Sequence, residues 1–201
     1  MSGQLNESGR DLLFRNARTH RAWLPQPVGD DTLRELYDLM KWAPTSANTC
    51  PGRVVFLRTP QAKERLRPAL APGNVDKTMA APVTAILAYD LRFFEKMGKL
   101  APTRPTAGER FASPPDFAER MALQGGTLQA GYFILAARSV GLDCGPMGGF
   151  ENAKVDAEFF APGTALESWR SNILCNLGYA DPAKLAPRDP RLDFGEACTI
   201  L

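Results

Sequence analysis

One predicted helix constrains the fold of this 201-residue sequence more than any other feature. Ser113-Pro114-Pro115-Asp116 has the composition of a helix start, with serine at the N-cap, proline at the first position and an acid in the first turn. An apolar periodicity then runs to about Ser139, and Gly141 follows as a natural C-cap. Each glycine inside a helix costs about 1 kcal/mol relative to alanine, and this stretch holds Gly125, Gly126 and Gly131. We therefore predict a central core helix whose glycines allow neighbouring elements to approach closely.

Apolar stretches elsewhere in the chain predict buried strands. Continuous runs of apolar residues are typical of strands that are covered on both faces. Such runs occupy residues 53–58, 83–89 and 173–179. The final residues of the chain are also apolar, so we expect the C-terminal tail, residues 184–201, to dock against protein rather than to remain in solvent.

Amphipathic periodicity predicts several helices between these strands. Asp30 or Asp31 would cap a helix that extends to Met40. Its apolar face would consist of Leu33, Leu36, Tyr37 and Met40. Shorter helices are expected near residues 11–17, 60–68, 74–81, 91–100 and 154–160. Residues 101–115 contain four prolines and little periodicity, so we expect an irregular loop there.

Composition narrows the functional classes. Hydrophobic residues make up 44% and charged residues 23% of the chain, and the net charge is +2. These values are typical of one soluble domain spanning residues 1–201 and argue against a nucleic-acid-binding protein. No apolar run is long enough to span a membrane, and the polar N-terminal sequence lacks a signal-peptide core, so we expect a cytoplasmic protein.

Metal and nucleophilic sites receive little support. The four cysteines form no C-x-x-C pair, and reduced thiols are expected for them. His20 is the only histidine, which excludes a metal site that needs two histidines. A Cys-His pair stays open, because sequence does not fix which cysteine lies near His20.

Three polar or glycine-rich stretches are candidates for ligand binding. Pro44 ends the helix before it, and the short polar side chains of Thr45, Ser46 and Asn48 suit either a polar turn or a ligand-binding loop. Residues 141–150 suit either a flexible turn or a loop whose backbone approaches a ligand. They lack the lysine of a P-loop and the G-x-G-x-x-G spacing of a dinucleotide fold. The basic residues 15–21 suit either a solvated face or an anion site. Residue types alone favour the structural alternative for the polar turn and for the basic residues.

Taken in order, these stretches resemble the FMN-dependent nitroreductase family. Pro44-Thr45-Ser46-Ala47-Asn48 resembles the family's Pro-Ser-Ser-x-Asn loop, and Arg18-Thr19-His20 its N-terminal Arg-x-Ser segment. Asn74-Val75-Asp76-Lys77 is similar to its Asn-x-x-Lys motif, and Pro146-Met147-Gly148-Gly149 to its loop under flavin N5. The sequence departs from the family where His20 stands for serine, Cys50-Pro51-Gly52 for Gln-Pro-Trp, and Gly148 for an acid.

This resemblance implies roles for individual residues. Arg18, Arg188 and Arg191 would hold the FMN phosphate, together with Thr19 and His20. Asn74 and Lys77 would contact the pyrimidine edge of the flavin. The loop of Pro146, Met147, Gly148 and Gly149 would lie under N5, with the Gly148 backbone and Lys77 tuning the flavin. Thr45, Ser46 and Asn48 would reach the FMN of a partner subunit. No catalytic triad or metal is implied, because the flavin supplies the redox chemistry.

The resemblance also implies a fold and an activity. The fold would be α+β, a mixed sheet flanked by helices, in an obligate homodimer with an exchanged C-terminal tail and FMN at the interface. NADH or NADPH would give a hydride to flavin N5 and leave, and a small-molecule substrate would then take its place in a ping-pong cycle. The sequence does not distinguish the two nicotinamide cofactors.

A subgroup resemblance suggests a substrate. The chain is similar to malonic semialdehyde reductases of pyrimidine degradation in Leu-Met-Lys-Trp-x-Pro-Thr-Ser-Ala-Asn, Leu-Arg-Pro-Ala-Leu, Gly-Leu-Asp-x-Gly-Pro-Met and the C-terminal Glu-Ala-Cys. Reduction of malonic semialdehyde to 3-hydroxypropanoate is the first expectation, and a nitroaromatic or quinone substrate is the second. A flavin-binding module without turnover and an enzyme that consumes FMN itself are the remaining alternatives.

Overall fold

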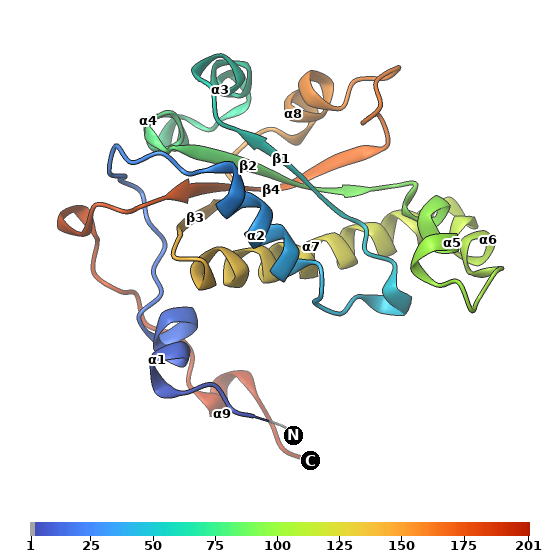
Figure 1. The fold of residues 1–201 in the computed structure, drawn as a ribbon, viewed down its shortest axis with the longest axis horizontal. Coiled ribbons are helices and arrows are strands. Elements are labelled where there is room, and N and C mark those ends of the chain that lie inside the picture. Colours follow the sequence, from blue (N-terminus) through green and yellow to red (C-terminus); the bar gives the residue numbers. More distant parts are fainter. Residues whose placement is uncertain (1–2) are drawn as a thin grey trace.

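A computed structural model of the chain describes residues 3–201, and its centre is a four-stranded sheet. The strands are β1 (Gly52–Leu57), β2 (Val83–Asp90), β3 (Asp143–Met147) and β4 (Trp169–Gly178). Their spatial order is β1-β2-β4-β3, and every neighbouring pair is antiparallel (Figure 1). The prediction of a mixed sheet is therefore wrong for these strands. The parallel pairing seen in the described residues is a single bridge between Thr19 and Cys144.

The strand β3 was not expected, because its residues were interpreted as part of a glycine-rich loop. It forms because β4 is ten residues long and offers backbone partners along both edges. Proline lacks an N–H donor and is tolerated on edge strands, and Pro146 lies on this edge strand opposite Cys175. The pairing thus depends on a partner distant in sequence, which local composition does not reveal.

The predicted central helix is confirmed as α7 (Pro115–Ser139), which packs across one face of the sheet together with α2 (Asp30–Met40) (Figure 1). Two of its glycines face close neighbours. A Cβ atom on Gly125 would lie 2.7 Å from Pro51, and one on Gly126 would lie 2.7 Å from Tyr89. A Cβ on Gly131 would meet nothing within 4 Å. Close packing therefore explains two of the three glycines.

Both helix-start predictions need correction. The N-cap of α2 is Gly29 rather than Asp30 or Asp31, and the N-cap of α7 is Pro114 rather than Ser113. Neither cap residue donates or accepts a side-chain capping bond. Tyr37 also leaves the predicted apolar face of α2 and is half exposed, whereas its companions on that face are buried.

Three helices cover the other face of the sheet. They are α3 (Pro60–Leu66), α4 (Pro72–Ala80) and α8 (Asn152–Phe159), and a short 3₁₀ turn at Arg67–Ala69 follows α3. Figure 1 shows them on the side of the sheet opposite α2 and α7. Each face of the sheet therefore has its own apolar core, and this second layer positions α4 beside the end of β3.

The proline-rich stretch beyond β2 is more regular than expected. After a 3₁₀ turn at Phe93–Lys96 come α5 (Met97–Leu100) and α6 (Ala107–Ala112), although residues 101–115 were predicted to be a loop. The ring of Phe111 lies 5.8 Å from that of Phe93 between centroids, in an apolar cluster that also includes Met97. Burial of Phe111 thus explains why α6 forms in a stretch whose prolines predicted a loop.

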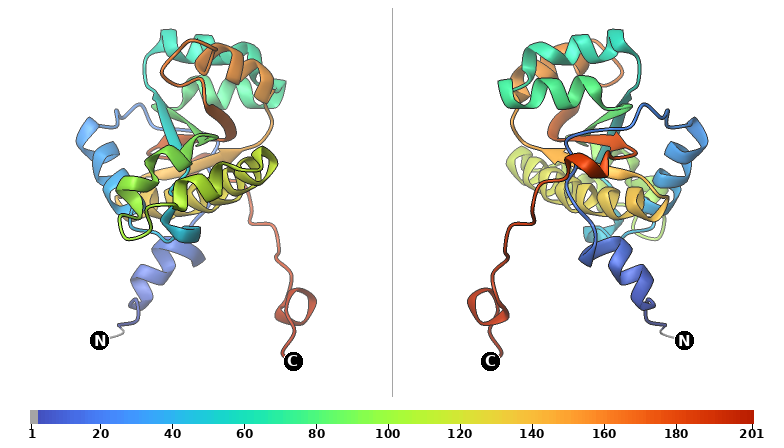
Figure 2. Two further views of the ribbon diagram at one scale, coloured as in Figure 1. Left: turned by 90° about the vertical axis from the view of Figure 1, so that its right-hand side faces the viewer. Right: turned by 90° about the vertical axis from the view of Figure 1, so that its left-hand side faces the viewer.

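The two ends of the chain extend from the body (Figure 2). The N-terminal segment contains α1 (Glu7–Arg10) and a π-helical turn at Asp11–Arg15, and the C-terminal tail contains a 3₁₀ turn at Pro182–Lys184 and α9 (Phe194–Ala197). In this single chain the apolar end of the tail does not dock as predicted: Leu192 is 70% exposed and Ile200 is 85% exposed. None of the helices among residues 3–201 combines the length and apolar composition that crossing a membrane requires. All four cysteines are free thiols.

Candidate functional site

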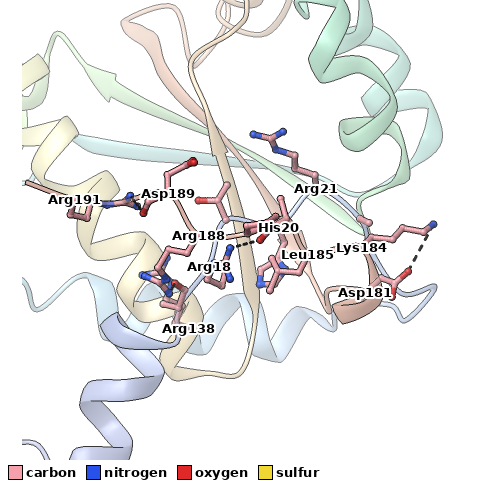
Figure 3. A pocket seen from close by; sticks show the side chains of 15 residues that line it. Arg18, His20, Arg21, Arg138, Asp181, Lys184, Leu185, Arg188, Asp189 and Arg191 are labelled. Carbon is pink, nitrogen blue, oxygen red and sulfur yellow. Dashed lines mark hydrogen bonds and ion pairs between the residues drawn. The ribbon is translucent and has the colours of Figure 1, made fainter.

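A cavity of about 200 Å³ lies between the N-terminal segment and the tail (Figure 3). Basic side chains dominate its lining. Arg18, Arg21, Arg138, Lys184, Arg188 and Arg191 contribute cations, and Asp181 and Asp189 contribute the opposing charges. Figure 3 shows Arg18, Arg138 and Arg188 grouped together, whereas Arg21 and Lys184 extend away from them. Such a donor set, with more cations than carboxylates, fits an anion with several oxygens.

The N-terminal wall of this cavity is an extension of the sheet. Thr19 bridges to Cys144 on β3, and the His20 N–H donates to the Cys144 carbonyl at 2.9 Å. A Cβ atom on Gly145 would lie 2.6 Å from the His20 carbonyl oxygen, so glycine at this position allows the close approach. The sheet thereby fixes the backbone that carries Arg18.

The arginines join the two chain ends through backbone carbonyls. Arg18 donates to the carbonyl of Ala186 at 2.5 Å, and Arg188 donates to the carbonyls of Arg15 and Ala17 at 2.7 and 2.8 Å. Arg191 donates to the carbonyls of its own neighbours in the tail. Within residues 3–201 none of these three arginines forms an ion pair with a carboxylate, so their charge is available to an anion.

His20 takes the position of the expected serine and has a carboxylate partner. Its Nε2 lies 3.3 Å from Oδ1 of Asp143, at the start of β3, and the other oxygen of Asp143 accepts the Ala180 N–H at 2.9 Å. This carboxylate fixes the imidazole against the sheet. His20 lines the cavity but is tied to β3 rather than grouped with the arginines.

Asn74 and Lys77 lie on α4, which faces the turn after β3. The side-chain amide of Asn74 donates to the Gly149 carbonyl at 2.6 Å, and the Ala71 N–H donates to the same oxygen at 3.0 Å. Burial, and secondarily the nearby Arg21 guanidinium, lower the pKa of Lys77. The structure therefore brings Asn74 to the turn after β3, and the repulsion between Lys77 and Arg21 shows that Lys77 lies near the lining of the cavity.

The predicted loop under N5 is partly strand. Pro146 and Met147 belong to β3, and only Gly148 and Gly149 form an exposed turn beyond it. The two glycines differ in their surroundings. A Cβ atom on Gly149 would lie 2.5 Å from Nδ2 of Asn74, whereas a Cβ on Gly148 would meet nothing within 4 Å. Gly148 therefore leaves open space at the surface, and Gly149 is required by the packing of Asn74.

The third predicted group, Thr45, Ser46 and Asn48, lies apart from the cavity. In Figure 1 its segment is beside α5 and α6, at the far end of the molecule from the residues that line the cavity. Asn48 donates to the Leu100 carbonyl at 2.8 Å, and the Thr45 hydroxyl accepts the Cys50 N–H at 3.1 Å. The structure does not bring these side chains together with Arg18 or Lys77 in one chain.

Backbone strain marks this same loop. Ala47, Asn48 and Cys50 have positive φ angles of 51°, 60° and 40°, which are unusual for residues other than glycine. Each such residue costs about 1–3 kcal/mol and persists where surrounding contacts enforce it, often at ligand sites. The expected tryptophan is absent for a structural reason: the Gly52 N–H donates to Oε1 of Gln129 at 2.6 Å, and a Cβ on Gly52 would lie 2.7 Å from that atom.

Sequence reasoning missed Arg138. It lies in the last turn of α7, donates to the Leu13 carbonyl at 2.9 Å and lines the cavity beside Arg18. A basic residue in the last turn of a helix complements the helix dipole, so its sequence context suggested no ligand. Only the packing of α7 under the N-terminal segment reveals its position.

Comparison with known proteins gives a consistent result. The model of the nitroreductase family matches residues 14–179. A protein of Cupriavidus pinatubonensis, provisionally named NADH dehydrogenase/NAD(P)H nitroreductase, is 55% identical over 192 residues, which cover 94% of this chain and 96% of that protein. A Leptothrix cholodnii protein with the same provisional name is 53% identical over 201 residues and 100% of both chains. A crystal structure from Exiguobacterium sibiricum, provisionally named a nitroreductase and solved in complex with FMN, shares the fold with a TM-score of 0.84 at 16% identity, covering 100% of both chains.

Proposed function

Since the chain belongs to the nitroreductase family, it is an NAD(P)H-dependent oxidoreductase that uses FMN, and we propose that it reduces a small electrophile in a ping-pong cycle. One observation carries this proposal. Residues 18–20 and 146–149 lie on or beside β3, Asn74 of α4 bonds the turn after β3, and residues 188–191 line the same basic cavity as residues 18–20, although these segments are distant in sequence. The single lysine of α4, Lys77, lies near Arg21, which lines the basic cavity.

The residues present fit FMN at its phosphate end. Arg18, Arg188 and Arg191 would bind the phosphate oxygens, and the position of Arg138 suggests a fourth contact. Their present acceptors are neutral backbone carbonyls, and charge-assisted bonds to a phosphate are stronger. Thr19 and His20 would flank the phosphate from the edge of β3.

The residues at the other end fit a flavin ring. Asn74 and Lys77 would contact its pyrimidine edge, and the exposed backbone of Gly148 and Gly149 would lie below it. When bound, FMN accepts a hydride from NADH or NADPH and passes it to the substrate. Lys77 would stabilise the negative charge that the reduced cofactor carries, and the absence of a side chain at Gly148 keeps that face of the site open.

We propose that two copies of this single-domain chain assemble, with the loop of Thr45, Ser46 and Asn48 completing the partner's site. Three features support assembly: the separation of this loop from the cavity, its strained backbone and the exposure of the tail. Apolar side chains that a monomer would leave in water include Phe14, Trp42, Phe194, Ile200 and Leu201. We expect the tail to exchange between subunits. Sedimentation should find a dimer, and a stable monomer that retains FMN would contradict the assembly.

The substrate class is proposed from the subgroup motifs. Malonic semialdehyde, reduced to 3-hydroxypropanoate, is the first candidate, and a nitroaromatic or quinone is the second. The purified yellow protein should bleach rapidly when mixed anaerobically with NADPH or NADH. Loss of NAD(P)H absorbance should then identify the substrate in a panel of semialdehydes, nitroaromatics and quinones. A protein that binds FMN but is not bleached by either nicotinamide would contradict the proposal. A cytoplasmic location stays a prediction.

A further inference from the structure

A buried lysine on the helix next to α4 has an unusual environment. Lysine is almost never fully buried unless its charge has partners, yet Lys63 of α3 is only 4% exposed. Lys63 and Leu66, one turn apart, are the two buried residues of α3, so the lysine points inward with the apolar face of its helix. This burial requires compensation for the ammonium group.

The compensation comes from the C-terminal end of α4. Nζ of Lys63 donates to the carbonyls of Thr78 at 2.8 Å, of Met79 at 3.3 Å and of Ala81. The last four carbonyls of a helix lack partners within the helix, and this end of the helix dipole is negative. An ammonium has three N–H donors, so Lys63 uses all of them to cap this helix end. Burial lowers the pKa of Lys63 to about 8, so the ammonium still predominates near pH 7.

Two further side chains hold the preceding carbonyl of the same helix. Nε1 of Trp23 donates to the Lys77 carbonyl at 3.1 Å, and Nδ2 of Asn176 on β4 donates to it at 3.3 Å. Asn176 is itself fixed, because its Oδ1 accepts the hydroxyl of Thr84 on β2 at 2.8 Å. Donors from the N-terminal segment, α3 and β4 thus converge on the end of α4.

We infer that Lys63 is a positioning residue, which holds α4 so that Asn74 and Lys77 face the ring end of the cofactor site. Lys77 directly precedes the first carbonyl that Lys63 caps, so a shift of this helix end moves the lysine. Displacements of about 1 Å in a site can cost about a hundredfold in function. The inference rests on the proposed function, because it assigns Lys63 to the residues that would contact FMN.

The test measures ligand binding and redox potential rather than turnover. Lys63→Met should weaken FMN and riboflavin by the same factor, about tenfold, because the ring end is common to both ligands. It should also lower the midpoint potential of bound FMN, in the direction expected when Lys77→Met removes the lysine itself. The double variant, with both Lys63→Met and Lys77→Met, should have the same midpoint potential as Lys77→Met alone. The reason is that both substitutions remove the same interaction, the one between Lys77 and the reduced cofactor. Lys154→Met is the matched control, because Lys154 is exposed, pairs with Glu151 and should leave all three quantities unchanged.

Several outcomes would overturn the inference. An unchanged midpoint potential in a folded Lys63→Met protein would show that Lys63 stabilises the fold but does not position the residues that contact FMN. A potential shift that adds to that of Lys77→Met shows that Lys63 acts by another route. If Lys63→Met does not fold, Lys63→Gln keeps neutral N–H donors and should give a smaller shift in the same direction, and no shift would reject the inference. Failure of the parent protein to bind FMN would instead reject the proposed function.

Discussion

The two ends of the proposed cofactor site are built in opposite ways. At the phosphate end, Arg188 and Arg191 come from an exposed tail, and Arg18 from the segment that this tail crosses. At the ring end, α4 is held by Lys63 and Asn176, both of which are buried. The phosphate end thus consists of charged side chains near the two ends of the chain. The ring end consists of a helix that the core holds in place.

This difference predicts that the two ends of the site control different properties of the bound cofactor. Arginines that donate to backbone carbonyls can exchange these acceptors for phosphate oxygens, so the phosphate end should supply affinity. A lysine held by a rigid helix can stabilise the reduced cofactor more than the oxidised one, so the ring end should set reactivity. Variants at the two ends should therefore differ in which measurement they change.

The largest effect is expected at the phosphate end. Charge-assisted bonds contribute about 1.5–3 kcal/mol each, so Arg18→Ala should weaken FMN by about one to two orders of magnitude. Adding Arg188→Ala should weaken it further, because Arg188 reaches the same cavity from the opposite chain end. Fluorescence titration with FMN and riboflavin measures both affinities. Riboflavin, which lacks the phosphate, should bind parent and variants almost equally, and equal weakening of both ligands would remove Arg18 from the phosphate site.

At the ring end, Lys77→Met should change redox potential rather than affinity. A charge-assisted bond of about 1.5–3 kcal/mol made only to the reduced cofactor corresponds to about 30–65 mV for a two-electron couple. The midpoint potential should fall by about this amount, with slower reduction by NAD(P)H and nearly unchanged binding of oxidised FMN. Potentiometric titration of parent and variant measures the shift. An unchanged potential together with an unchanged rate would show that Lys77 does not touch the cofactor.

Two adjacent glycines offer a matched pair for the same end. Gly149→Ala places a Cβ atom against Nδ2 of Asn74 and should break the bond from that amide to the Gly149 carbonyl. Loss of a neutral hydrogen bond is worth about 0.5–1.5 kcal/mol, so FMN and riboflavin should both weaken, by about tenfold at most. Gly148→Ala adds its Cβ to open space, so it leaves the Asn74 bond intact and tests instead whether the flavin lies over this glycine, in which case both ligands should weaken. Unchanged binding in Gly149→Ala would show that the Asn74 bond does not shape the site, and unchanged binding in Gly148→Ala would show that the flavin does not lie over Gly148.

The sequence predicted the helices better than the sheet. Local signals sufficed for the extent of α7, which follows from proline, periodicity and Gly141, although the helix begins at Pro115 rather than Pro114. Strand β3 was missed because its pairing depends on β4, more than twenty residues away. Helix α6 was missed because its formation depends on the burial of Phe111 rather than on local propensity.

The candidate site shows the same division between local and distant information. Resemblance located Arg18, Asn74, Lys77 and Gly149, which the fold gathers along β3 and α4. It gave no signal for Arg138 or Lys63, because the hydrogen bonds of each are with an element distant in sequence. In the single chain Thr45 lies apart from the cavity, and its proposed place beside a partner's cavity stays a prediction.

The smallest effect is expected from Lys184→Ala, and it defines the limit of the phosphate end. Lys184 lines the same cavity as Arg18, but its side chain is 71% exposed and lies 3.9 Å from Asp181. Figure 3 shows it extending away from the grouped arginines. Exposed charges contribute at most about 1 kcal/mol and are screened by salt. FMN affinity should therefore fall by less than about fivefold, and the fall should disappear when the titration is repeated at high ionic strength. A loss as large as that of Arg18→Ala would place Lys184 on the phosphate itself and would extend the phosphate end along the tail.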